Sequence, residues 1–240
     1  MTSLFEGIIN PFLDFLYPAN CVECQSAGTL LCEDCKQRLV FIEDPICRIC
    51  GYPTLASKTC KACESYTISQ LDSARSVVLY QDTIITTAIH HFKYNNKQAL
   101  GRELAHLLAE YYNRHQPQID VIVPVPLHKT RQKTRGYNQS TILAKHLSNL
   151  INKPVDLKTL RRKRATDQQI SLSPGERQKN VAGAFTTIST QLAKATILLI
   201  DDVFTTGATL NACASALKQG QTSEVHGLTV ARALDKQSWG

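Results

Sequence analysis

The 240-residue sequence has no run of about 20 apolar residues, the length that a membrane-spanning helix requires. Its first 20 residues have neither a basic start nor a small-residue cleavage site, so we expect no secretory signal and a cytoplasmic protein. The chain also lacks the GxxxxGK[ST] and GxGxxG fingerprints of nucleotide-binding loops. Neither a P-loop nucleoside triphosphatase nor a dinucleotide-dependent enzyme is therefore supported.

Aromatic residues are scarce, and positive charge is concentrated in one segment. Residues 128–179 hold thirteen basic and three acidic side chains, a net charge of +10, against +7 for the whole chain. This concentration favours a local anion site over a generally basic surface. Aromatic residues make up 7% of the chain, and Tyr137 is the one aromatic in the basic stretch "HKTRQKTRGYN". Base stacking on single-stranded nucleic acid therefore has weak support.

Cysteine is abundant only at the start of the chain. Paired cysteines in a chain without a secretory signal favour zinc over disulfides, and two Cys-x-x-Cys pairs complete one tetrahedral site. We expect two structural zinc ions and assign the first two pairs to one ion and the last two pairs to the other. The spacing leaves an interleaved pairing open, and a redox or disulfide module is the alternative. The eight cysteines are Cys21, Cys24, Cys32, Cys35, Cys47, Cys50, Cys60 and Cys63. The ninth, Cys213, is expected in the core.

Hydrophobic periodicity predicts two units, a Cys-rich module over residues 1–70 and an α/β domain over residues 71–240. Alternating strands and helices in the second unit predict a parallel sheet flanked by helices. Residues 128–138 are interpreted as a basic loop, and residues 158–180 as a long loop with at most one short helix. Strands are expected at residues 73–80, 121–127, 183–187, 196–200 and 225–232, and helices at residues 3–18, 83–94, 98–115, 140–152 and 209–219.

The stretch "ILLIDDVFTTGATL", residues 197–210, combines a buried strand with an anion-binding loop. Asp201 and Asp202 follow the apolar run, and the "TTGAT" loop then opens a helix. Backbone N–H groups at a helix start bind anions, and Gly207 permits a close approach. The loop suits a phosphate, and the two carboxylates suit the hydroxyls of a ribose or a Mg²⁺ ion. A ribose 5-phosphate satisfies both halves.

"LLIDDVFTTGATL" resembles the motif with which type I phosphoribosyltransferases bind phosphoribosyl pyrophosphate (PRPP). Together with the Cys-x-x-Cys pairs, "FKY", "VIVPVPLHKTRQKTRGYNQS" and "TDQQISLSPGERQKNVAGAF", it is similar to the ComF family over nearly the whole chain. The resemblance implies a phosphoribosyltransferase-like core behind a double zinc ribbon. For competence members it also implies the handling of incoming single-stranded DNA during natural transformation, alongside the DNA-uptake machinery.

The resemblance also implies roles for individual residues. Asp201 and Asp202 would contact the ribose hydroxyls, directly or through Mg²⁺, and serve as the catalytic pair of an active enzyme. The 5-phosphate would lie on Thr205, Thr206, Gly207, Ala208 and Thr209. The pyrophosphate would lie near Arg131, Lys133, Arg135, Gly136 and Lys93, although a lysine is also favourable at a helix C-terminus. The basic run Arg161, Arg162, Lys163 and Arg164 has three interpretations: a phosphate lid, a nucleic-acid contact or plain solubility.

Three functions follow from these features. The first is a protein that binds PRPP or a ribose phosphate and handles single-stranded DNA in the cytoplasm. The second is an active PRPP-dependent phosphoribosyltransferase of nucleotide metabolism, whose acceptor the sequence does not name. The third is a sensor that binds PRPP as a signal and presents its zinc module to a protein partner. The chain begins Met1-Thr2, without the N-terminal cysteine of a glutamine amidotransferase, so that activity is not supported.

Overall fold

A computed structural model describes residues 19–55, 58–65, 69–81, 83–164 and 174–234. The helix expected at residues 3–18 lies outside these ranges, as do residues 165–173 of the basic segment. Among the described residues, none of the helices combines the length and the apolar character needed to cross a membrane.

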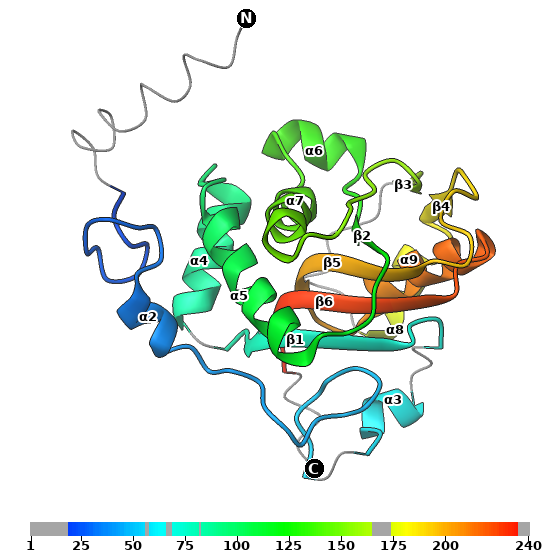
Figure 1. Cartoon of the computed structure of the whole chain (residues 1–240), viewed down its shortest axis with the longest axis horizontal. Coiled ribbons are helices and arrows are strands. Elements are labelled where there is room, and N and C mark those ends of the chain that lie inside the picture. Colours follow the sequence, from blue (N-terminus) through cyan, green and yellow to red (C-terminus); the bar gives the residue numbers. More distant parts are fainter. Residues whose placement is uncertain (1–18, 56–57, 66–68, 82, 165–173, 235–240) are drawn as a thin grey trace, which may run out of the picture.

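Four parallel strands form the central sheet (Figure 1). Their order is β1-β6-β5-β2, and each neighbouring pair is parallel. The strand β2 is buried along its whole length, as is the apolar part of β5, because a parallel sheet is covered on both faces. The expected parallel sheet is therefore confirmed. Its strands are β1 (Ser73–Leu79), β2 (Val121–Pro124), β5 (Thr196–Phe204) and β6 (Glu224–Arg232).

Helices cover the two faces of this sheet. The helices α4 (Thr83–Tyr94), α5 (Leu100–His115) and α7 (Gln139–Ile151) pack on one face, and α9 (Ala208–Gln219) packs on the other. Side chains of β5 alternate between the two cores, because successive strand residues point to opposite faces. Leu198 and Ile200 join the first core, whereas Ile197 and Leu199 join the second.

Two expectations about the basic segment are wrong. Residues 129–135 form a short helix, α6 (Lys129–Arg135), rather than a loop. His128 caps its start by accepting from the N–H of Thr130, and Gly136, with a φ of 85°, ends it. The helix buries none of its residues, so no apolar periodicity reveals it. The other error concerns residues 158–180, which contain a strand as well as the helix α8 (Pro174–Val181).

That strand, β3 (Leu160–Arg162), pairs antiparallel with β4 (Phe185–Thr187), outside the main sheet. Two residues after β3, Arg164 Nη2 donates to the carbonyls of Asn180 at 2.8 Å and Ala182 at 3.0 Å. Three-residue strands are too short to show an alternating pattern in the sequence.

The eight paired cysteines form two clusters, with α2 (Glu33–Gln37) in the first and α3 (Lys61–Ser65) in the second. Within each cluster the four sulfurs lie within 4.8 Å of one another, and the grouping matches the successive pairing expected above. The Sγ atoms of Cys24 and Cys32 are 3.5 Å apart, and those of Cys50 and Cys60 are 3.6 Å apart. Zn–S bonds of about 2.3 Å require a sulfur–sulfur edge of about 3.8 Å, so both clusters fit a tetrahedral zinc ion.

The two cysteine clusters pack against different cores. Cys21 and Cys35 join the core beneath α4 and α5, where Lys36 Nζ lies 2.8 Å from Glu103 Oε2. Cys47, Cys50 and Cys60 join the core beneath α9. The chain between the clusters adds to the edge of β1, through hydrogen bonds of 2.9 Å between Ile42 and Val77 and between Leu79 and Val40. A boundary at residue 70 stays a prediction.

We predict that the purified protein holds two zinc ions per chain. Cys35→Ser should retain one ion, because a three-cysteine site binds zinc far more weakly than a closed one. Cys213→Ser is the matched control, since Cys213 is a buried cysteine outside both clusters, and it should retain two. Native mass spectrometry measures the metal count. Two ions in Cys35→Ser would contradict the assignment.

Candidate functional site

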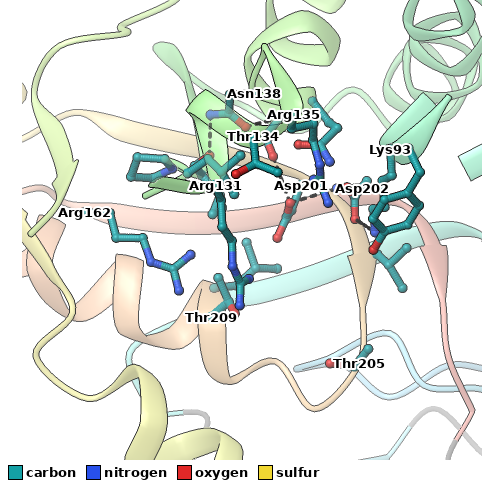
Figure 2. Close-up of a pocket in the computed structure, with 18 of the residues that line it drawn as sticks. Lys93, Arg131, Thr134, Arg135, Asn138, Arg162, Asp201, Asp202, Thr205 and Thr209 are labelled. Atoms are coloured by element: carbon teal, nitrogen blue, oxygen red, sulfur yellow. Dashed lines mark hydrogen bonds and ion pairs between the residues drawn. The ribbon is translucent and has the colours of Figure 1, made fainter. Parts of the chain in front are cut away.

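A cavity of about 1090 Å³ lies at the carboxyl edge of β2 and β5 (Figure 2). Ligands of parallel α/β sheets bind at this edge, because each strand delivers its following loop there. The segments that line the cavity include α4, the chain after β2, α6, the start of α7, β3, β5 and the start of α9. The residues predicted above that line it are Lys93, Arg131, Lys133, Arg135, Gly136, Arg162, Asp201, Asp202, Thr205, Gly207 and Thr209.

The two carboxylates lie inside β5 rather than after it. The strand continues to Phe204, and Asp201 is paired in register with Thr229 of β6. The expectation that the aspartates follow the strand end is therefore wrong by a few residues. The continuation of β6 beside them accounts for this, because it supplies a hydrogen-bonding partner beyond the apolar run. The strand holds both carboxylates on rigid backbone at the cavity wall.

Each carboxylate has its own partner. Lys93 Nζ lies 2.7 Å from Asp202 Oδ1, and Ser140 Oγ donates to Asp201 Oδ1 at 2.8 Å. Figure 2 shows Asp202 facing Lys93, while Asp201 lies on the side of the cavity toward Arg131. Burial lowers the pKa of Lys93, but the charges of Asp202 and Asp201 outweigh burial and raise it, so Lys93 is a cation. Its contact with pyrophosphate stays a prediction.

Asp201 is the carboxylate of the pair whose ionised form is less well stabilised. Burial, followed by the neighbouring charge of Asp202, raises the pKa of Asp201 to about 7. The hydrogen bond from Ser140 and the charge of Lys93 only partly offset these effects. The charge of one lysine thus neutralises two carboxylates only in part. The cavity therefore favours an additional cation or hydrogen-bond donor beside Asp201.

The expected phosphate loop joins β5 to α9. Gly207 has a φ of 78° and is the N-cap of α9, so a left-handed residue is required there. Thr205, Gly207, Thr209 and the first turn of α9 line the cavity, and a first turn has N–H groups without intrahelical acceptors. Thr206 does not line the cavity but supports the loop, because its Oγ1 accepts from the N–H of Ala208 at 3.4 Å. Ala208, the donor of that hydrogen bond, is buried and does not line the cavity either.

Basic side chains face this loop from two elements. Arg131, Lys133 and Arg135 come from α6, and Arg162 comes from β3. Figure 2 shows Arg131 reaching toward Thr209, with Arg162 beside it. Burial lowers the pKa of Arg162, and the nearby charge of Arg131 adds to this effect. The two guanidinium groups therefore make a strongly positive wall opposite the phosphate loop.

The four basic residues 161–164 lie in different environments. Only Arg162 lines the cavity, and its guanidinium lies 5.2 Å from the ring centre of Phe185. Arg161 and Lys163 are exposed outside it, and Arg164 donates to the carbonyls of Asn180 and Ala182. A nucleic-acid role for Arg161, Lys163 and Arg164 stays a prediction.

Three further residues were not predicted in their observed roles. Ser140, which donates to Asp201, ends the stretch "VIVPVPLHKTRQKTRGYNQS", but no role was predicted for it. Tyr94 lines the cavity and is 59% exposed, with Arg135 5.0 Å from its ring centre and His90 at the same distance. Tyr137 is buried, and its hydroxyl donates to the carbonyl of Phe92. Tyr94, at the end of "FKY", is thus an exposed aromatic side chain of the cavity, whereas Tyr137 is buried and does not line it.

Comparisons with known proteins match both parts of the chain. A double zinc ribbon domain matches residues 12–64, and a phosphoribosyl transferase domain matches residues 92–238. Competence protein F of Haemophilus influenzae is 30% identical over 227 residues, covering 89% of this chain and 96% of that protein. Competence protein ComFC of Bacillus subtilis is 28% identical over 85% of this chain and 84% of its own length.

Two further matches complete the comparison. DNA utilization protein YhgH of Escherichia coli is 29% identical over 85% of this chain and 97% of that protein. Among solved structures, the glutamine PRPP amidotransferase of B. subtilis has a TM-score of 0.41 and 17% identity. That match covers 58% of this chain and 30% of the amidotransferase.

We predict that Asp201→Asn stabilises the free protein at high pH. A carboxyl whose folded pKa lies near 7, above its unfolded value of 3.8, stabilises the fold at low pH and loses that contribution as pH rises through about 7. The amide carries no charge, so the free energy of unfolding should rise by about 2 kcal/mol at pH 8 and change little at pH 5. Urea unfolding at both pH values measures this. A loss of stability at pH 8 would contradict it.

Proposed function

Because the chain belongs to the ComF family, whose members join a double zinc ribbon to a phosphoribosyl transferase domain, we propose that its cavity binds PRPP or a related ribose phosphate with Mg²⁺. We also propose that the protein handles single-stranded DNA in the cytoplasm during natural transformation. The observation that carries the first part is one cavity in which a phosphate loop, two carboxylates and a basic wall converge.

The residues present fit the parts of the ligand. The loop Thr205–Thr209 offers backbone N–H groups and hydroxyls to the 5-phosphate. Asp201 and Asp202 offer carboxylate oxygens, which ribose hydroxyls donate to and which Mg²⁺ prefers in combination with substrate phosphates. Arg131 and its neighbours on α6 offer positive charge to the pyrophosphate. When bound, Mg²⁺ would neutralise part of the pyrophosphate charge.

The surplus of positive charge supports the DNA part of the proposal. The cavity is lined by four basic side chains from α6 and β3, in addition to Lys93, against two carboxylates. The phosphates of a DNA strand would lie along the basic side chains of α6 and β3. Tyr94 offers an exposed ring to a base. The names of relatives point the same way, since one is called a DNA utilization protein and two are called competence proteins. A protein partner among the DNA-uptake machinery belongs to the same proposal.

An active phosphoribosyltransferase is the second candidate, and the size of the cavity favours it. Its volume of about 1090 Å³ lies just above the range of about 300–1000 Å³ for small-molecule sites, which leaves room for an acceptor beside PRPP. Catalysis would break the bond between ribose C1 and the pyrophosphate oxygen, and an acceptor nitrogen would take the ribose. Release of pyrophosphate in a screen of nucleobases separates this candidate from the binding protein.

We predict that the zinc-loaded protein binds PRPP in a Mg²⁺-dependent way. Asp201→Asn should weaken binding by about 100-fold, since a hydrogen bond to a charged group contributes about 1.5–3 kcal/mol. The same variant is expected to gain stability, so lost binding is not lost folding. Arg161→Ala, an exposed change outside the cavity, is the matched control and should bind normally. Titration calorimetry measures the PRPP affinities. Equal affinities in the wild type and in Asp201→Asn would contradict the assignment of the cavity as the PRPP site.

We predict salt-sensitive binding of single-stranded DNA that depends on α6 and Tyr94. Each lost phosphate contact should reduce the slope of log K against log salt by about 0.7, so Arg131→Ala with Lys133→Ala should reduce it by about 1.4. Tyr94→Leu should weaken DNA binding about tenfold, with an unchanged slope, because it removes stacking and not charge. Lys145→Ala on exposed α7 surface is the control. Fluorescence anisotropy measures DNA binding by the wild type and the three variants. Equal salt slopes in all four proteins would contradict phosphate contacts by Arg131 and Lys133.

A further inference from the structure

Arg232, the last residue of β6, is a buried cation without a carboxylate. It is 4% exposed, and no ion pair among the described residues includes it. A buried charge is costly unless a counter-charge or hydrogen bonds compensate it. The groups around Arg232 therefore have to supply that compensation.

The second cysteine cluster supplies it. Arg232 Nη1 donates to the carbonyl of Cys50 at 2.6 Å, and Nη2 donates to Cys50 Sγ at 3.3 Å. Four thiolates around one zinc ion carry a net charge of about −2, so the loaded cluster is the counter-ion that the guanidinium otherwise lacks. The contact spans 182 residues of sequence and joins the ribbon directly to the end of β6.

The other side of the guanidinium contacts the strand that carries the phosphate loop. Arg232 lies 4.3 Å from the ring centre of Phe204, its register partner in β5. Ala233 N also donates to the carbonyl of Phe204 at 2.9 Å. Phe204 is 1% exposed, lines the cavity and immediately precedes Thr205. Arg232 thus holds the residue from which the phosphate loop departs.

Among the described residues, the first cysteine cluster makes no such contact with the strand that carries the phosphate loop. Cys21 and Cys35 pack beneath α4 and α5, in the core on the opposite face of the sheet from α9. Figure 1 shows α2 beside α4, and α3 at the other end of the zinc module, beyond β1. The two clusters share chemistry and ligand number but differ in what they touch, so each is the natural control for the other.

We propose that Arg232 is a positioning residue that connects the second zinc site to the phosphate loop. Loss of zinc from the second site loosens Thr205–Thr209 and weakens ribose phosphate binding, whereas loss of zinc from the first site does not. The part about affinity rests on the proposed function, but the part about loop order does not. The sulfurs of a zinc site keep their positions only while the metal holds them, so the hydrogen bonds of Arg232 to Cys50 depend on it.

Hydrogen exchange of the backbone amides at residues 204–210 tests the connection without any ligand. Cys63→Ser should speed exchange there by about tenfold and Cys24→Ser should leave it unchanged, each variant having lost one zinc by mass spectrometry. Calorimetry with PRPP should then show affinity reduced about tenfold in Cys63→Ser only. Equal loop exchange in both cysteine variants overturns the proposal.

If Cys63→Ser unfolds, a second variant tests the same connection. Arg232→Met retains all eight cysteines and should retain two zinc ions, yet it should speed exchange at residues 204–210 as Cys63→Ser does. Unchanged loop exchange in Arg232→Met with both ions bound overturns the proposal. If the wild-type protein binds no PRPP, the proposed function fails, and the exchange comparison still decides whether Arg232 connects the two sites.

Discussion

Two adjacent carboxylates lie at the wall of a basic cavity, and one lysine forms an ion pair with just one of them. Asp202 has Lys93 at 2.7 Å, whereas Asp201 has only a serine hydroxyl and a backbone N–H. Burial without full compensation raises the pKa of Asp201 to about 7. The cavity therefore has one incompletely neutralised carboxylate and several arginines from α6 and β3. It suits a ligand that has hydroxyls or a cation in its middle and phosphates at its ends.

Each partner of this pair comes from a different element, which explains why the sheet needs its helices. Lys93 lies near the end of α4, Ser140 lies in the first turn of α7, and the loop that follows the carboxylates opens α9. The first cysteine cluster packs beneath α4 and α5, and the second packs beneath α9. The zinc module is thus part of both cores of the α/β domain, and its second cluster contacts, through Arg232, the strand that leads into the phosphate loop.

The sequence predicted the parts of the fold that repeat a pattern and missed the parts that depend on distant contacts. Apolar runs and 3.6-residue periodicity identified the four sheet strands and the helices α4, α5, α7 and α9, and Cys-x-x-Cys spacing identified the zinc clusters. The helix α6 was missed because it buries nothing, and β3 because three residues show no alternation. Arg162 was grouped with its basic neighbours, although only tertiary structure brings it to the cavity. Likewise, no local pattern assigns a role to Ser140 or Arg232, whose hydrogen-bond partners lie 61 and 182 residues away.

A crystal structure of the protein with PRPP and Mg²⁺ tests the central claim most directly, because it locates each part of the ligand. Our account predicts the 5-phosphate on Thr205–Thr209, the ribose hydroxyls or the metal at Asp201 and Asp202, and the pyrophosphate toward α6. A ligand whose phosphates lie elsewhere, with the loop empty and the Lys93–Asp202 pair unchanged, would contradict the assignment of this cavity as a ribose phosphate site.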